Sequence, residues 1–262
     1  MHKVAVEPVA DVMTALGTDR LPGQLAALLR AIAPVSYVVA FGYLGASRPM
    51  ALFDDFPAHR WQVFVGEYQE GPYLLDPFYL ATTRPGMSGL YRIKELAPDR
   101  FYQGEYFRNY YVQTGLAEEI GYFVALPGGV TVVLSLMRAE RPFSGREFRA
   151  LHGVGPLVDA AVKIHWADLS HRFSQGMGLP ALARPGGDLG RAFARIGGSV
   201  LTRREREVVE YTLKGHSAEA TGMILHIAPG TVRIHRRNIY AKLGISSQGE
   251  LFASFIRALS EM

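Results

Sequence analysis

The chain has 262 residues, enough for one large domain or two ordinary ones. Hydrophobic residues make up 48% and charged residues 20% of it, which is typical of a folded globular protein and not of a disordered or fibrous one. The absence of cysteine excludes disulfides, a thiol nucleophile and zinc sites built on thiolates, while the net charge of +4 permits a polyanionic partner.

The amino-terminal segment gives no targeting signal. Glu7 and Pro8 stand where a signal peptide needs an apolar run. No stretch of the sequence approaches the ~18–20 consecutive apolar residues that cross a bilayer. We therefore expect a cytoplasmic protein that makes no contact with a membrane.

Residues 1–172 predict an α+β domain in which helices flank one antiparallel sheet. The expected elements are a helix at 25–32, strands at 37–44 and 49–53, a helix at 60–68, strands at 120–126 and 130–136, and a helix from 143 to about 166. The turn Pro127-Gly128-Gly129 makes the last two strands the clearest hairpin of the chain. In order and size these elements are similar to the GAF- or PAS-like input domains of sensory regulators.

An aromatic-rich stretch between residues 61 and 111 is the candidate ligand pocket of this domain. The pattern Tyr68-x4-Tyr73-x2-Asp76-Pro77 resembles the Trp-Tyr-Asp-Pro signature of acyl-homoserine-lactone receptors, with a spacing that differs by a residue or two. The resemblance implies that Asp76 accepts a hydrogen bond from a ligand amide and that Tyr91 replaces a later tryptophan. Trp61 completes the candidate pocket. The alternatives are plain core packing for the aromatic side chains and an Asp-Pro turn or helix start for Asp76.

Several other functions are excluded or less favoured for residues 1–172. The paired acids of a phosphoacceptor domain and a glycine-rich phosphate loop are both missing from the sequence. Acidic residues are available for acid–base work, but no spacing fits an enzyme, so we expect no catalytic residue, metal or cofactor. Glu118 and Glu119 are expected in a solvated turn. The open hypotheses are a domain that senses a small molecule, one that binds a protein partner and, third, an enzymatic domain.

Glycine and proline interrupt the chain at 173–198, where Pro180, Pro185 and Gly186 stand. We interpret this stretch as a linker that lets two domains reorient. Residues 199–262 then form the second domain. From Leu201 onward, nine Lys and Arg stand against six Asp and Glu, so most of the net charge lies in this smaller part.

The second domain predicts an all-α module of four short helices. Thr202 and Glu205 form a capping box at the start of the first helix, and Gly215 ends that helix. Ser217 caps the second helix, which ends near 225–226. A third helix begins at Pro229 and ends at Gly244, and Ser246 or Ser247 caps the fourth. Two helices joined by a turn of three or four residues, between supporting helices, form a helix-turn-helix.

The helical period assigns the faces of the third helix. Val232 and Ile239 are expected in the core, whereas Arg233, Ile234 and Arg237 point outward together. Arginine can fork onto guanine and an apolar side chain can contact the thymine methyl, so these three are the candidate base contacts in a DNA major groove. The alternative is an ordinary solvated basic face. The candidate contacts to the DNA backbone are Thr231, Arg236, Lys242 and Lys214.

The module resembles the DNA-binding domain of the LuxR/FixJ family. The shared residues are Leu201-Thr202-x-Arg204-Glu205-Arg206-Glu207-Val208, Gly215, Ser217, Gly230-Thr231-Val232-Arg233-x-His235-x-x-Asn238-Ile239-x-x-Lys242-Leu243-Gly244-Ile245-Ser246-Ser247 and Glu250-Leu251. The resemblance implies that the third helix enters the major groove of double-stranded DNA and reads it through the three candidate base contacts. It also implies a homodimer on a palindromic operator, with a dimer contact on the last helix at Leu251, Phe252 and Phe255.

Three departures from the family pattern concern the turn and the first motif helix. His226 stands where members have glycine, in a backbone position that favours a left-handed conformation. Ala228 stands where members have Ser or Thr, so the third helix loses a side-chain cap. Gly222 stands where members have alanine, at a cost of about 1 kcal/mol in a helix interior. Together these departures predict a module that depends on its dimer or on DNA for full order.

Overall fold

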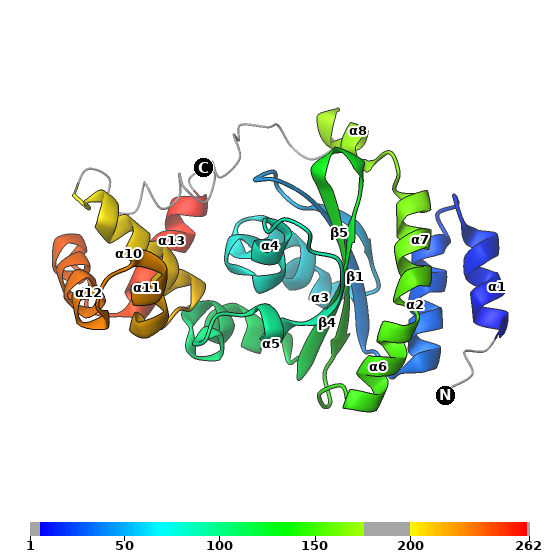
Figure 1. Ribbon diagram of the computed structural model, residues 1–262, viewed down its shortest axis with the longest axis horizontal. Coiled ribbons are helices and arrows are strands. Elements are labelled where there is room, and N and C mark those ends of the chain that lie inside the picture. The colour runs from blue at the N-terminus through cyan, green and yellow to red at the C-terminus, as the bar shows by residue number, and fades with distance from the viewer. Residues whose placement is uncertain (1–5, 176–199, 261–262) are drawn as a thin grey trace. The chain divides into compact units, whose positions relative to one another are not determined.

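The computed structural model describes residues 6–175 and 200–260 (Figure 1). Packing divides the chain into two compact units. The first unit is drawn from residues 1–61, 81–96 and 116–181, and the second from residues 62–80, 97–115 and 182–262. The predicted linker at 173–198 lies outside the described residues from position 176 onward. Every helix within 6–175 and 200–260 is too short or too polar to cross a lipid bilayer.

A five-stranded sheet organises the first unit. Its strands are β1 (Tyr37–Leu44), β2 (Met50–Asp54), β3 (Gly89–Arg92), β4 (Glu118–Ala125) and β5 (Val130–Arg138). They lie in the order β2-β1-β5-β4-β3, and each neighbouring pair is antiparallel. The predicted strands and the turn at Pro127–Gly129 are confirmed. Two apolar runs on either side of a Pro-Gly-Gly turn, in which Gly128 is left-handed, are a local signal of a hairpin.

Helices cover one face of this sheet (Figure 1). They are α2 (Leu21–Ile32), α6 (Gly145–Gly153) and α7 (Gly155–His165), with α1 (Val6–Ala15) packed on the outer side of α2 and α8 (Leu169–Ser174) following α7. Alternate strand residues such as Ala40, Tyr122 and Leu134 face the helices and are almost fully buried with them. Their neighbours on the opposite face, including Phe41 and Phe123, are buried as well.

One expectation about helices in the first 172 residues was wrong. The single helix expected from 143 to about 166 is broken into α6 and α7, because Pro156 cannot continue a helix and instead starts α7. Ser144 begins α6 with a capping box to Glu147. The helix expected at 60–68 is present: α3 (Ala58–Trp61) continues into a π-helical stretch, Gln62–Glu67, and the chain stays helical to residue 69.

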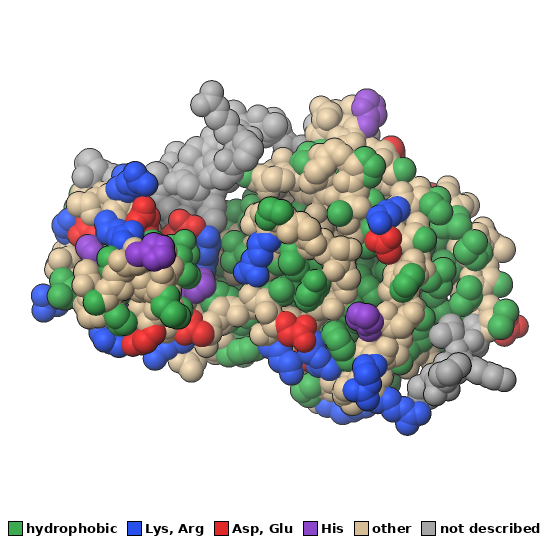
Figure 2. Space-filling model, viewed as in Figure 1, with side chains coloured by type: hydrophobic (Ala, Val, Ile, Leu, Met, Phe, Trp, Pro, Cys, Tyr) green, Lys and Arg blue, Asp and Glu red, His purple; other side chains and the backbone are tan. Residues whose placement is uncertain are grey.

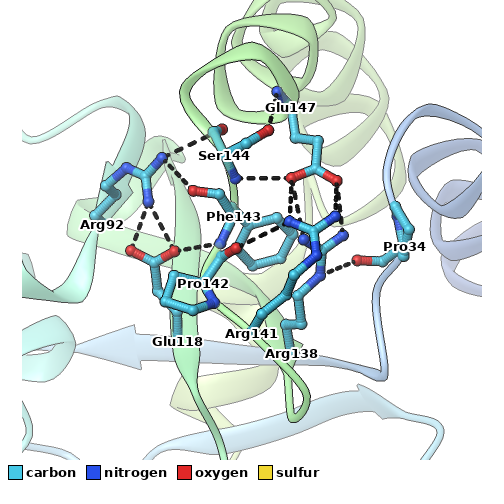
Figure 3. A network of polar contacts seen from close by, with 9 residues as sticks. All are labelled: Pro34, Arg92, Glu118, Arg138, Arg141, Pro142, Phe143, Ser144 and Glu147. Carbon is cyan, nitrogen blue, oxygen red and sulfur yellow. Dashed lines mark hydrogen bonds and ion pairs between the residues drawn. The ribbon is translucent and has the colours of Figure 1, made fainter.

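A polar network, buried at Arg92, Glu118 and Arg138 and exposed at Arg141, ties the sheet to the start of α6 (Figure 3). Arg92 Nη1 lies 2.6 Å from Glu118 Oε1, and Glu118 Oε2 accepts a hydrogen bond of 2.7 Å from Phe143 N. Beside them Glu147 binds both Arg138, at 3.1 Å, and Arg141, at 2.9 Å. The expectation of a solvated turn at Glu118 was therefore wrong. Glu118 lies within β4 and is a buried ion-pair partner.

Residues 200–260 contain four helices, as predicted. They are α10 (Arg203–Lys214), α11 (Ala218–Leu225), α12 (Pro229–Leu243) and α13 (Gln248–Ser260). The capping box of Thr202 and Glu205 is present, Ser217 caps α11, and Gly215 and Gly244 end their helices in the left-handed conformation. The hydroxyl of Ser247 accepts a hydrogen bond of 3.2 Å from Glu250 N, so Ser247 caps α13. The second unit also contains short helical turns at Pro72–Leu75, Phe101–Gln103, Phe107–Tyr111 and Val112–Thr114, and α4 (Pro77–Thr82) and α5 (Ile93–Leu96) complete the described helices.

Candidate functional site

Helices α11 and α12 form the helix-turn-helix, joined by a turn at 226–228. His226 ends α11 with φ +54°, and it is the only residue other than glycine with a positive φ within 6–175 and 200–260. Histidine tolerates this region better than a β-branched residue does. The predicted left-handed turn at His226 is therefore confirmed. Ala228 gives α12 no side-chain cap, also as predicted, and Pro229 occupies the first turn.

Gly222 corrects one expectation about this motif. A Cβ atom added at Gly222 would lie 2.7 Å from the carbonyl oxygen of Ile227 and 3.4 Å from Pro229 N. Ile227 N in turn donates a hydrogen bond of 2.9 Å to Gly222 O. Glycine is therefore needed for the close approach of the turn to α11. The prediction that Gly222 weakens the module was wrong.

The faces of α12 agree with the predicted ones. Val232 and Ile239 are buried at 0% and 1% exposure, whereas 51% of Ile234 is exposed. Arg233 and Arg237 are exposed on the same side as Ile234. No residue of α12 is acidic, so its exposed face carries only positive charge of its own. Such a face suits the major groove of DNA, where guanine presents two acceptors and thymine a methyl group.

Acidic side chains from neighbouring helices lie among these cations (Figure 2). Arg233 forms an ion pair with Glu219 of α11, and their side chains are 62% and 54% exposed. The pKa of Glu219 is lowered, first by a hydrogen bond from the backbone N–H of Glu219 itself and then by the charge of Arg233. No hydrogen bond or ion pair of the Arg237 side chain is found within the described part of the chain. Sequence reasoning missed Glu219, although its place in the first turn of α11 could have indicated it.

Three of the four candidate backbone contacts have partners within the module. Lys242 Nζ lies 2.8 Å from Glu205 Oε2, and Glu205 is only 4% exposed. Arg236 Nη2 donates a hydrogen bond of 2.9 Å to the carbonyl oxygen of His216, and burial lowers the pKa of Arg236. Lys214 forms an ion pair with Glu210, one turn earlier in α10. Each of these contacts stabilises the module, so each side chain would exchange a partner to reach a phosphate.

The candidate dimer residues of α13 lie in the core of the second unit. Leu251, Phe252 and Phe255 are 1%, 8% and 0% exposed. Their side chains are not on a free surface of α13, because the apolar stripe of this amphipathic helix packs inward. Ala253 and Arg257 are exposed positions of the helix.

The candidate ligand residues divide into separate groups. Tyr68 Oη donates a hydrogen bond of 2.6 Å to Asp76 Oδ2, and the ring of Tyr73 lies 6.2 Å from Tyr68 and 5.0 Å from Tyr79. Phe78 N donates a hydrogen bond of 2.8 Å to Asp76 Oδ1. Burial raises the pKa of the Asp76 carboxyl to about 6, against these two hydrogen bonds, which lower it. The structure therefore brings Tyr68, Tyr73 and Asp76 together.

The other two candidate ligand residues belong to the first unit. Trp61 is 45% exposed at the end of α3. The ring of Tyr91 packs edge-on against Phe123 at 5.7 Å, and Tyr91 Oη donates a hydrogen bond of 3.1 Å to Ser88 O. Within the described residues, no group of three or more His, Cys, Asp or Glu side chains could hold a metal ion.

Comparison with known proteins matches residues 199–255 to the family described as "Bacterial regulatory proteins, luxR family". A protein of Aeromonas salmonicida with the name "Putative HTH-type transcriptional regulator in exeN 3'region" is 33% identical over 186 residues, which are 70% of this chain and 94% of that protein. The transcriptional activator protein SolR of Ralstonia solanacearum is 27% identical over 235 residues, 84% of this chain and 86% of SolR.

Among solved structures, the VqsR LBD domain from Pseudomonas aeruginosa is similar to this chain with a TM-score of 0.53 and 26% identity. The likeness covers 61% of this chain and 94% of that domain. The sheet with flanking helices and the helix-turn-helix therefore each have relatives among bacterial regulators, and one relative is similar along nearly its whole length. The chain belongs to the luxR family of bacterial regulatory proteins and is a transcriptional regulator with a DNA-binding helix-turn-helix.

Proposed function

We propose that this regulator reads a specific, palindromic DNA operator through α12, and that it binds the operator as a homodimer. The observation that carries the proposal is the exposed face of Arg233, Ile234 and Arg237, which lies opposite the buried side of a helix without acidic residues. Two such helices of a symmetric dimer read half-sites one turn of DNA apart, about 34 Å. Lys214, Thr231, Arg236 and Lys242 are the proposed contacts to the DNA backbone.

Selection of binders from a duplex library with a randomised core tests this proposal with the full chain. The expected result is one enriched sequence with two inverted half-sites, bound by two copies of the chain in sedimentation experiments. Enrichment of a palindrome by a strict monomer would contradict the dimer, and enrichment of no sequence would contradict specific reading.

We further propose that residues 1–172 form a domain that senses a small molecule and controls DNA binding, and that the linker at 173–198 joins it to the module at 199–262. The hydrogen-bonded Tyr68 and Asp76 beside the Tyr73 ring support this, because polar anchors among aromatic walls are typical of ligand sites. The likeness to the VqsR LBD domain supports the same assignment. An effector with an amide N–H, such as an acyl-homoserine lactone, would suit the Asp76 carboxylate.

Native mass spectrometry of the full chain, purified from its own host, tests the sensing proposal. The expected result is a retained small molecule, which the Asp76→Asn variant retains less well. A co-purifying protein without a small molecule would instead support a domain that binds a protein partner. Conversion of the bound molecule to a product would indicate an enzyme.

A further inference from the structure

The ion pair between Glu219 and Arg233 places a negative charge beside a proposed base-reading side chain. Arg233 comes from α12, which has no acidic residue, and Glu219 is supplied by the first turn of α11. Both side chains are more than half exposed, so the pair lies at the surface of the motif and not in its core. An exposed pair of this kind stabilises a fold little, so its effect on DNA binding is the informative one.

The position of Glu219 keeps its carboxylate charged. Negative side chains are favourable in the first turn of a helix, and the carboxylate also accepts a hydrogen bond from its own backbone N–H. Glu219 therefore remains a carboxylate at neutral pH, whether or not Arg233 stays beside it. A charged carboxylate next to the recognition helix repels DNA phosphates and attracts Arg233.

We infer that Glu219 is a specificity-determining residue, which holds Arg233 until a base edge with two acceptors displaces it. The inference rests on the proposed role of Arg233 as a base contact. A DNA phosphate is an anion, as the Glu219 carboxylate is, so Arg233 gains little when it exchanges Glu219 for a phosphate. Phosphates are also the same in every DNA sequence. Guanine offers two well-placed acceptors in the major groove and discriminates against other bases. Glu219 thus disfavours binding to random DNA more than binding to the operator.

Removal of the Glu219 carboxylate is expected to change the binding of random DNA more than the binding of the operator. With Glu219→Gln, Arg233 is free to bind a phosphate of any sequence, and one additional phosphate contact steepens the dependence of log K on log salt by about 0.9. On the operator Arg233 already binds a base, so the salt dependence stays the same. Affinity for the operator rises by less than about fivefold, since only the exposed pair is lost.

The experiment uses the full chain and two probes: the duplex that selection enriches most, and the unselected randomised pool. Fluorescence anisotropy gives the affinity for each probe between about 50 and 200 mM salt. The expected result for Glu219→Gln is a rise in affinity for the pool of about five- to tenfold at the low-salt end, with the steeper slope on the pool alone. The matched control is Glu207→Gln, which removes a carboxylate that pairs with Arg203 and Arg204 on α10. It should change the two probes equally.

The background Arg233→Ala decides between the inference and its alternatives. If the effect of Glu219→Gln disappears in that background, it acts through Arg233, as inferred. Persistence of the effect, or an equal change on both probes like that of Glu207→Gln, overturns the inference and leaves the proposed DNA reading intact. If Arg233→Ala alone leaves affinity for the enriched duplex unchanged, the role of Arg233 as a base contact fails, and the inference fails with it.

Discussion

Substitution of Gly222 by alanine should destabilise the helix-turn-helix, although alanine is the better helix former. Alanine would gain about 1 kcal/mol from its helical preference. Its Cβ, however, would lie 2.7 Å from the carbonyl oxygen of Ile227, which is backbone and cannot rotate away. The turn would have to move, at an overpacking cost of about 1–3 kcal/mol, and would loosen the 2.9 Å hydrogen bond from Ile227 N to Gly222 O, worth about 1 kcal/mol. We expect a net loss of about 1–3 kcal/mol.

Urea unfolding followed by far-ultraviolet circular dichroism measures this loss, and hydrogen exchange of peptides covering 218–228 assigns it to the motif. The matched control is Gly230→Ala in the first turn of α12, where an added Cβ meets no heavy atom within 4 Å outside its chain neighbours and the backbone of its own helix. This control should be neutral or stabilising by up to about 1 kcal/mol. The steric argument is refuted if Gly222→Ala unfolds at the same or a higher urea concentration than the parent with an unchanged m-value.

Four further outcomes are expected. Arg237→Ala should weaken binding to the enriched duplex by about 1–3 kcal/mol and relax the preference at one base pair, as competition with single-base variants would show. Lys242→Ala should flatten the salt dependence by about one unit on every sequence and also lower stability, because its Nζ lies 2.8 Å from a buried carboxylate; identical DNA-binding behaviour of these two variants would contradict the assigned faces. Arg92→Met should cost about 3–5 kcal/mol in urea unfolding, since it leaves the buried Glu118 carboxylate without its cation. The pKa of Asp76, about 6 in the fold against an ordinary value of 3.8, means that the folded chain binds an extra proton between these values. Its stability relative to Asp76→Asn should therefore fall as pH rises from about 4 to 6, by on the order of 2–3 kcal/mol in total, and stay level above that.

The helical module was predictable because its signals are local. The capping box at Thr202, the cap at Ser217 and the terminal glycines Gly215 and Gly244 each act within one turn of their own helix. The left-handed conformation of His226 was expected for another reason, because members of the family that the module resembles have glycine at this position. Periodicity then separated the buried Val232 from its exposed neighbours, since all of them lie on one regular helix.

The remaining features depend on contacts between distant segments. Glu118 follows a turn in the sequence, and nothing near it indicates that Arg92, 26 residues away, would meet it in the core. The steric need for Gly222 arises only when the turn folds back onto α11. From the sequence alone, a glycine inside a helix indicated only a less stable helix. The break before α7, in contrast, was predictable from a local signal, because proline inside a helical pattern usually ends or starts a helix. The prediction of one long helix did not take Pro156 into account.

The same distinction applies to the basic face of α12, because a sequence counts charges but not their partners. Of its four cations, Lys242 lies against a buried carboxylate and Arg236 donates to a carbonyl, so both contribute to holding the helix in place. Arg233 has a partner at the surface, from which exchange costs little. Arg237 is exposed and gives up no described contact when it meets DNA. For the proposed DNA reading by α12, we therefore expect the affinity to depend less on the total charge of the helix than on how readily each cation leaves its partner. Arg237 is then the side chain whose removal should report most directly on base reading.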